Sequence, residues 1–339
     1  MSGRAFRVQR TGRGSTIGML LAGIVVVVLL FVPLWADSAA KRLVIEVCCY
    51  LALAQMWNLL AGFAGLVSVG QQAFVGLGAY ALFALTMLLP LPPLVALPLA
   101  GLLAAAIALP TAGIVFRLRG AYFAIGTWVM AEVFRLLLAL ATPLGGGTGM
   151  SLPAAVIRSI AEGRSARETT IYYIGLAVGL GSVALVFFWL RSRQGLALTA
   201  IRDSETAAGS VGVDGGRTKL AVYVVTAGVT GIVGALIFLE KIRISPDAAF
   251  SVGDWSAEVI FIVVIGGIGR IEGPIVGTLI FLALRHWLAD FGAWYMILLG
   301  ATAVVVMLCA PQGLWGLFAD ATGIQFFPVQ RRVRLLTQE

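Results

Sequence analysis

Residues 190–216, LRSRQGLALTAIRDSETAAGSVGVDGG, are polar and rich in turn-forming residues, and apolar runs at 171–190 and 220–239 lie on either side. Each run has about 20 residues, which is enough for a helix to cross a hydrocarbon core of ~30 Å. The contrast predicts a solvated loop that joins two membrane-spanning helices. The fold class therefore depends on whether such runs recur elsewhere in the chain.

Apolar runs do recur from one end of the chain to the other. The 339 residues are 60% hydrophobic and 12% charged, with a mean hydropathy of +0.99, whereas soluble domains carry about 25% charged residues. We expect an all-α polytopic membrane protein with about ten spans, near 17–36, 43–62, 73–89, 94–116, 120–141, 171–190, 220–239, 256–268, 271–289 and 293–310. No long soluble domain is left between them.

The basic residues predict the orientation of these spans. With ten crossings and an inner N-terminus, fifteen of the 24 basic residues fall in inner segments and seven in outer ones, as the positive-inside rule requires. Residues 1–16 and 319–339 are then cytoplasmic tails, and 17–318 form the membrane domain. We interpret the first run as a retained helix, because it is longer than the apolar part of a signal peptide.

Two segments break the pattern of regular spans. Residues 62–73, GFAGLVSVGQQA, are polar and glycine-rich, and the span at 256–270 is short and ends in GGIGR. Irregular backbone at membrane depth occurs where protein or a water-filled cavity satisfies it, and interrupted segments in both halves of a transporter point to the substrate path. The alternative for 62–73 is a cytoplasmic loop.

The composition excludes several classes of function. The net charge of +8 is spread over many short loops, so nucleic-acid binding is not expected. Three cysteines lie in apolar runs and there is one histidine, so we expect no metal site and no catalytic residues. None of the three lysines follows a glycine, which rules out a standard phosphate loop in this chain.

Four ionisable residues fall within the expected spans: Glu46, Glu132, Arg135 and Arg285. A charge at the centre of a bilayer costs about 2.5–3.5 kcal/mol on insertion scales, so each one invites a functional hypothesis. Glu132 and Arg135 are three residues apart on one helix face. Mutual pairing near the outer end of that helix is favoured over a proton relay.

Six sequence blocks resemble the permease subunit of branched-chain amino acid ABC transporters, and most closely the larger of the two paired permeases. The blocks occur in order: GLVSVGQQAFVGLGAY (65–80), RGAYFAIGTWVMAEVFR (119–135), GGGTG (145–149), ISPDAAF (244–250), GGIGRIEGPIVG (266–277) and APQGLWGL (310–317). The resemblance implies a permease in a bacterial inner membrane that works by alternating access and carries out no covalent chemistry. It also implies a second homologous permease, two ATPase subunits that hold ATP and Mg, and a periplasmic binding protein.

The resemblance assigns a role to the polar segment at 190–219. Permeases of this class dock a short cytoplasmic helix into a groove of the ATPase. The expected coupling residues are Arg202, Asp203, Glu205, Ala207, Ala208 and Gly212. Ser204 is expected to cap this helix, and Gly212 is expected to end it. No Leu-Pro tail follows the motif.

The candidate translocation path is lined by mostly neutral and small groups. Its residues are Ser68, Gly70, Gln71, Gln72, Tyr80, Thr127 and Glu132, and the outer loop residues Gly146, Gly147 and Thr148 face its mouth or the binding protein. These groups suit a small zwitterion or neutral solute. A branched-chain amino acid is the favoured solute. Urea and aromatic acids are alternative solutes for the same class of transporter, and an ion-coupled secondary transporter is the alternative class of protein.

Overall fold

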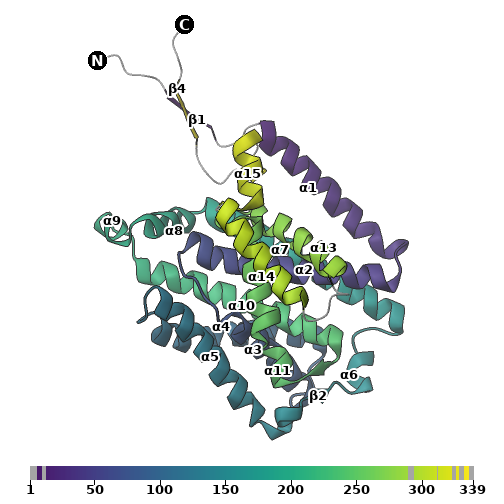
Figure 1. The fold of residues 1–339 in the computed structure, drawn as a ribbon. Helices are drawn as coiled ribbons and strands as arrows, with labels where there is room; N and C mark the ends of the chain where they lie inside the picture. Colours follow the sequence, from purple (N-terminus) through teal and green to yellow (C-terminus); the bar gives the residue numbers. More distant parts are fainter. Residues whose placement is uncertain are drawn as a thin grey trace.

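The chain is helical over most of its length, as the computed structural model shows for residues 6–9, 13–288, 294–310, 312–322, 326–327 and 332–335 (Figure 1). A helix overlaps each of the expected spans: α1 Arg13–Phe31, α2 Ser38–Asn58, α3 Gln71–Met87, α4 Pro93–Val115, α5 Ala121–Ala139, α7 Arg164–Arg191, α10 Gly215–Lys241, α12 Glu258–Gly266, α13 Glu272–Leu288 and α14 Trp294–Cys309. The shorter helices are α6 Ala154–Arg158, α8 Arg193–Asp203, α9 Glu205–Ser210, α11 Pro246–Ala249 and α15 Gly313–Thr322.

Not all of these helices are long enough to cross a membrane alone. Within the described residues, seven helical stretches are long and apolar enough: Ser38–Phe63, Pro93–Val115, Ala121–Ala139, Arg164–Arg191, Gly215–Lys241, Pro246–Gly266 and Ile297–Thr322. Two shorter apolar helices cover Leu20–Leu34 and Gln71–Met87. The polytopic helical class is confirmed, while the count of ten crossings stays a prediction.

The outer surface of the helical body is apolar. Helix α5 points Ile125, Trp128 and Val129 away from the protein, and α14 does the same with Val305 and Leu308. An exposed apolar surface of this extent needs apolar surroundings. Hydrocarbon chains of a bilayer supply them.

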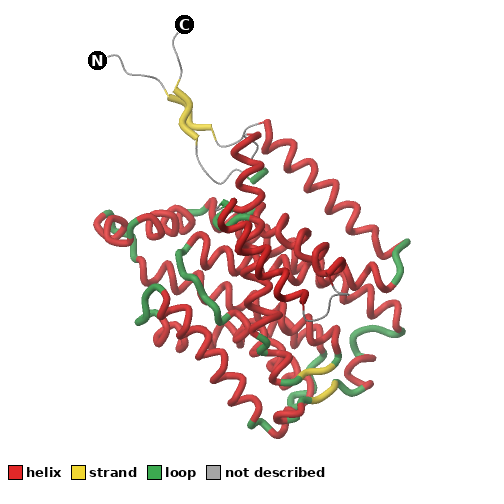
Figure 2. Tube along the Cα trace, viewed as in Figure 1, coloured by secondary structure: helices red, strands yellow, loops and turns green. Residues whose placement is uncertain are grey.

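Two short antiparallel ribbons add to the helices, and both are visible in Figure 2. Strand β1 (Phe6–Gln9) pairs with β4 (Arg332–Leu335), so the two terminal segments lie side by side (Figure 1). Strand β2 (Met150–Ser151) pairs with β3 (Arg243–Ile244). The second ribbon ties the loop after α5 to the loop after α10.

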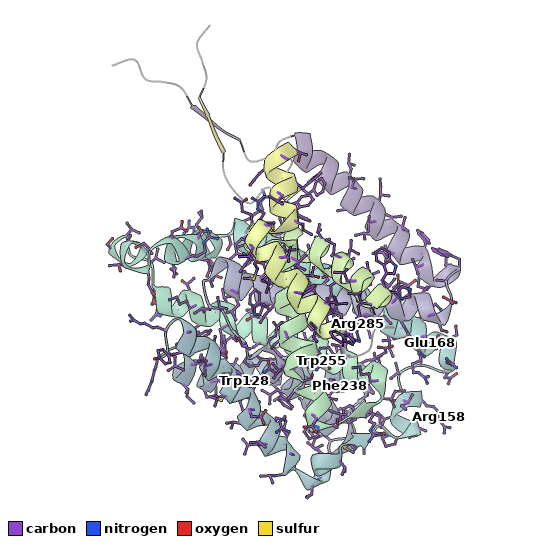
Figure 3. The ribbon with its side chains drawn as sticks, in the orientation of Figure 1. Trp128, Arg158, Glu168, Phe238, Trp255 and Arg285 are labelled. Atoms are coloured by element: carbon purple, nitrogen blue, oxygen red, sulfur yellow. The ribbon has the colours of Figure 1, made fainter. Side chains whose placement is uncertain are left out.

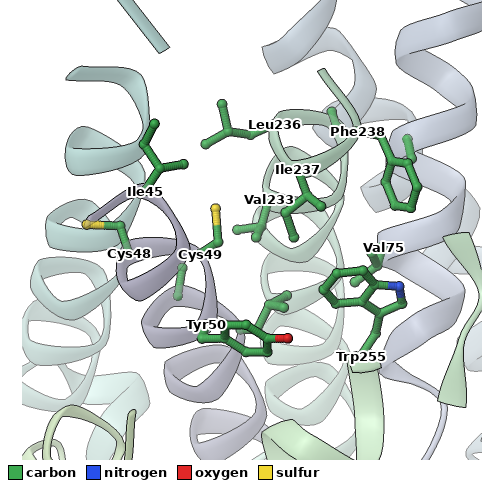
Figure 4. Packing of buried hydrophobic residues seen from close by; sticks show 14 of the residues in the cluster. Ile45, Cys48, Cys49, Tyr50, Val75, Val233, Leu236, Ile237, Phe238 and Trp255 are labelled. Carbon is green, nitrogen blue, oxygen red and sulfur yellow. The ribbon is translucent and has the colours of Figure 1, made fainter. Parts of the chain in front are cut away.

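The core forms where α2, α3 and α10 meet. Cys49 and Tyr50 of α2, Val75 of α3 and Phe238 of α10 are buried together with Trp255, as Figure 4 shows. Helices α3 and α10 approach closely because Gly78 faces the backbone of Gly231. Small residues at a helix interface let the two backbones approach closely, so that van der Waals contact holds the helices together.

The first interrupted segment lies between α2 and α3. The end of α2 widens into a π-helical turn at Leu59–Phe63, the backbone of residues 64–70 is not helical, and α3 begins at Gln71. Ala64, Ser68 and Gly70 are buried, whereas Gly65 and Val67 are exposed. The expected break at 62–73 is therefore present but shorter, and only its middle has the exposure of a surface loop.

The second interrupted segment differs from the expectation of one short span at 256–268. A π-helical turn at Gly253–Ala257 joins directly to α12, and the helical stretch from Pro246 to Gly266 has 21 residues. The sequence pattern hid this length because polar residues such as Asp254 lie within the helix. The real break is the turn that follows, where Gly267 has φ +129° and Gly269 has φ +76°.

Candidate functional site

The polar segment at 190–219 forms two helices, α8 and α9, that project from the helical body (Figure 1). A side-chain oxygen caps each helix start. The Oγ of Ser192 accepts from the backbone N–H of Gln194 at 3.2 Å, and the Oγ of Ser204 accepts from the N–H of Ala207 at 3.3 Å. Such caps satisfy backbone N–H groups that have no partner within the helix. The predicted cap at Ser204 and the predicted short helix are confirmed.

The expected coupling residues surround α9. Glu205 forms an ion pair with Lys219 of α10, with 2.7 Å between Oε1 and Nζ. Ala208 is buried, whereas Asp203 and Ala207 are exposed. Gly212 has φ +85°, so it ends this part of the chain in a turn that favours glycine.

Arg202, another of the expected coupling residues, contacts the end of α2. Its Nη1 donates to the carbonyl oxygen of Gly62 at 3.1 Å. On the other edge of the guanidinium, Nε and Nη2 both lie 3.4 Å from Oδ1 of Asp203. The α8 helix is therefore linked to the first interrupted segment.

Two amides of α2 hold the turn between α12 and α13. Asn58 accepts from the backbone N–H of Gly269 at 2.8 Å and donates to the carbonyl oxygen of Arg270 at 2.8 Å. Gln55 donates to the carbonyl oxygen of Ile271, also at 2.8 Å. Three hydrogen bonds from one face of α2 thus hold the second interrupted segment against the helix that leads into the first.

Ser68 and Gln71 lie at a small internal cavity of about 20 Å³. Thr226 and Thr230 of α10 line its opposite wall. The Nε2 of Gln71 donates to the carbonyl oxygen of Leu53, while its Oε1 has no hydrogen-bond partner among the described residues. A cavity of this size holds one water molecule, so these residues line no open passage within the chain.

The other expected path residues are buried, with the exception of Glu132. Gln72 forms a hydrogen bond with Ser256, and Gly70 packs against the backbone of Thr127. Tyr80 is buried beside Phe250, with ring centroids 6.1 Å apart. The structure brings all these residues except Glu132 into the packed interior.

Glu132 instead lies partly exposed on α5, where it takes part in an ion pair. Arg135 forms ion pairs with both Glu132 and Asp247, at 2.5 and 2.6 Å. The expected pairing within α5 is confirmed. Glu46 and Arg285 are also paired, with 2.9 Å between Oε1 and Nη1, and Figure 3 shows Arg285 on α13 near Trp255.

The glycine-rich outer loop packs against the loop after α10. Gly149 faces the carbonyl oxygen of Ile244, next to the ribbon of β2 and β3. Gly146, Gly147 and Thr148 form a helical turn, and the hydroxyl of Thr148 donates to the carbonyl oxygen of Gly145 at 3.0 Å. Gly147 and Thr148 are exposed and Gly146 is partly exposed, so they are accessible at this surface.

A groove of about 600 Å³ lies where α9 meets the membrane body. It is lined by Gly65 and Val67 of the first interrupted segment, by Arg119 and Phe123, and by Glu205. No three His, Cys, Asp or Glu side chains of the described residues gather so that they could hold a metal ion. The groove therefore offers a mixed apolar and charged surface to a partner or solute.

Sequence reasoning missed several residues that organise this region. They are Gln55, Asn58, Thr226, Thr230 and Asp247. A signal was present for the first two, because amides three residues apart share one helix face in an otherwise apolar span. Asp247 carried no comparable signal, because its partner Arg135 is far away in sequence.

Comparisons with known proteins agree with this architecture. Residues 40–307 match the family model described as the permease component of branched-chain amino acid transport systems. The chain is 31% identical over 287 residues to the high-affinity branched-chain amino acid transport system permease protein LivM of Escherichia coli, covering 78% of this chain and 67% of that protein. LivM of Salmonella typhimurium gives the same identity and coverage.

No solved structure shows a significant match to this chain. The family match covers both interrupted segments and the projecting helices α8 and α9. The multiple apolar helices and this match together make the chain a multi-pass membrane protein. It belongs to the family of permease components of branched-chain amino acid transport systems.

Proposed function

We propose that this chain is one permease subunit of an ATP-driven importer that carries branched-chain amino acids across a bacterial inner membrane. The match to the permease family over residues 40–307 is the observation that carries the proposal. A second permease completes the pathway, two ATPases hold ATP and Mg, and a periplasmic binding protein delivers the solute. This chain itself catalyses no reaction.

The projecting helices are the proposed contact with the ATPases. Leu196 of α8 is 54% exposed, and Val211 after α9 is 78% exposed. In this proposal the ATPase covers these two exposed apolar side chains. The short side chains of Ala207 and Gly209 let α9 enter a groove closely.

The pathway is proposed to open between this chain and the second permease. The interior of this chain leaves a cavity of about 20 Å³ beside Gln71, which is too small for an amino acid. The ion-paired residues Glu132, Arg135 and Asp247 lie instead on the exposed side of α5 and α11. Charges at membrane depth face a partner or a water-filled path rather than lipid.

The test is uptake of radiolabelled leucine into liposomes that contain this chain, the second permease and the ATPases. We expect uptake that requires both ATP and binding protein. Replacing Glu205 with Arg places a cation against Lys219, so this variant should lose most of its bound ATPase and its uptake. Glu162→Arg, an exposed acid in the outer loop, is the matched control and should behave as wild type.

Other outcomes separate the alternatives. Uptake by this chain alone down an ion gradient would identify a secondary transporter. Uptake of urea or an aromatic acid in preference to leucine, with ATP still required, would keep the transporter class and change the solute.

A further inference from the structure

We propose that Arg202 is a positioning residue that couples the projecting helices to both interrupted segments of the membrane body. This inference rests on the proposed function, because it assigns the route by which movement of an ATPase reaches the pathway. The residues involved are Arg202 on α8, Gly62 and Asn58 at the end of α2, and Gly269 in the turn after α12.

The contact of Arg202 is directed and specific. Its Nη1 meets the carbonyl oxygen of Gly62 at 3.1 Å, in the π-helical turn that ends α2. A π-helical turn leaves carbonyl groups less regularly paired than an α-helix does. Asp203 holds the other edge of the guanidinium at 3.4 Å and so limits its rotation.

The contact continues into the second interrupted segment through Asn58. Asn58 is fully buried, and its amide accepts from Gly269 and donates to Arg270, both at 2.8 Å. The backbones are also in direct contact, because a Cβ atom at Gly62 would lie 2.6 Å from the backbone N of Gly269. The ends of α2 and α12 therefore move as one body at this point.

The projecting helices have two other kinds of attachment to the membrane body, and neither is a directed contact with an interrupted segment. The ion pair of Glu205 with Lys219 leads to α10, and the rest is apolar packing. Leu198 and Ile201 are buried, but apolar packing resists displacement without a preferred direction. A pull on α8 is thus transmitted to Gly62 and Gly269 through Arg202. Arg158 is an exposed arginine on α6, away from the projecting helices, and serves as the matched control.

The choice of arginine follows from the geometry. A guanidinium offers donors on two edges of a rigid plane, so it can bind Asp203 and Gly62 at the same time. A lysine keeps the charge and one donor direction but has a flexible stem. Lys at this position should therefore restore part of the coupling, whereas Ala should restore none.

The experiment compares Arg202→Ala, Arg202→Lys and Arg158→Ala in the complete transporter in liposomes. Three quantities are measured for each: ATPase retained on the purified complex, ATP hydrolysed, and leucine taken up. We expect Arg202→Ala to move at least tenfold less leucine for each ATP hydrolysed. Arg202→Lys should lie between Ala and wild type, and Arg158→Ala should match wild type.

A second variant tests the same link from the other side. Gly62→Ala keeps Arg202 but forces the Gly62 and Gly269 backbones apart, so it should also lower leucine uptake per ATP. If Arg202→Ala moves as much leucine per ATP as wild type, the inference is wrong. If Arg202→Ala instead loses the ATPase, Arg202 is a docking residue and the inference is also wrong.

Failure of the proposed function would look different. In that case the wild-type complex itself would bind no ATPase, or its uptake would not need ATP. The Arg202 variants are compared with a wild-type complex that already takes up leucine with ATP. A difference in leucine uptake per ATP between them therefore reports on coupling alone.

Discussion

Asn58 shows how one side chain can hold two distant parts of this molecule. Its amide lies at the end of an apolar helix, with no exposed surface, and satisfies one N–H and one C=O of a turn more than 200 residues away. The turn contains two glycines with positive φ, Gly267 and Gly269, and its backbone at Gly269 and Arg270 is bonded by the Asn58 amide. The stability of the turn therefore depends on an amide supplied from another helix.

Replacing Asn58 with Leu should destabilise the protein. The N–H of Gly269 and the C=O of Arg270, which are partly buried, would lose their partner, and each lost hydrogen bond costs about 0.5–1.5 kcal/mol. We expect the Tm of the purified protein in detergent to fall by several degrees. Gln194→Leu removes an exposed amide and is the control. Equal Tm values for the two variants would contradict the role given to Asn58.

At the scale of elements, α3 and α10 depend on glycine for their contact. A Cβ atom at Gly234 would lie 2.7 Å from the carbonyl carbon of Val75, and Gly78 faces Gly231 in the same interface. Helices in a bilayer gain little from hydrophobic burial against each other, so close van der Waals contact carries the packing. A larger side chain at Gly234 therefore acts on the whole interface.

Gly234→Val should force α3 and α10 apart. Overpacking of an interior usually costs about 1–3 kcal/mol, and here the obstacle is backbone that cannot rotate away. We expect less folded protein and a lower Tm by size-exclusion chromatography after heating. Gly181→Val on α7 is the control, because a Cβ atom there meets nothing within 4 Å. A Gly234→Val protein as stable as this control would refute the packing argument.

The elements also show what could be predicted from the sequence. The helices followed from apolar length, and the cap at Ser204 from a pattern only a few residues long, because both are local properties. The glycines of GGIGR predicted a break near residue 270, but the partners that hold this turn and the ion pair of Asp247 could not be predicted. They depend on hydrogen bonds and ion pairs between residues far apart in the chain. The long helical stretch at Pro246–Gly266 was missed because Asp254 interrupts its hydropathy.

At the scale of the whole molecule, the arrangement of charge predicts which ends of the helices face the cytoplasm. Arg202, Arg217 and Lys219 lie on or beside the projecting helices, and Arg270 lies at the turn that contacts them. Basic residues concentrated at one end of a helical bundle favour the cytoplasmic side. The loop that contains α6 follows the opposite end of α5 and is therefore expected outside.

Cysteine labelling tests this orientation directly. Ser210 in α9 and Glu162 in the loop after α6 are both exposed, so a cysteine at either position should react once a reagent reaches it. In spheroplasts, a membrane-impermeant maleimide should label Glu162→Cys at once and Ser210→Cys only after the membrane is permeabilised. Cys309 is exposed and must first be replaced by Ser, whereas Cys48 and Cys49 are buried. The reverse order of labelling would invert the predicted orientation, and it would place α8 and α9 on the side of the membrane where no ATPase can reach them.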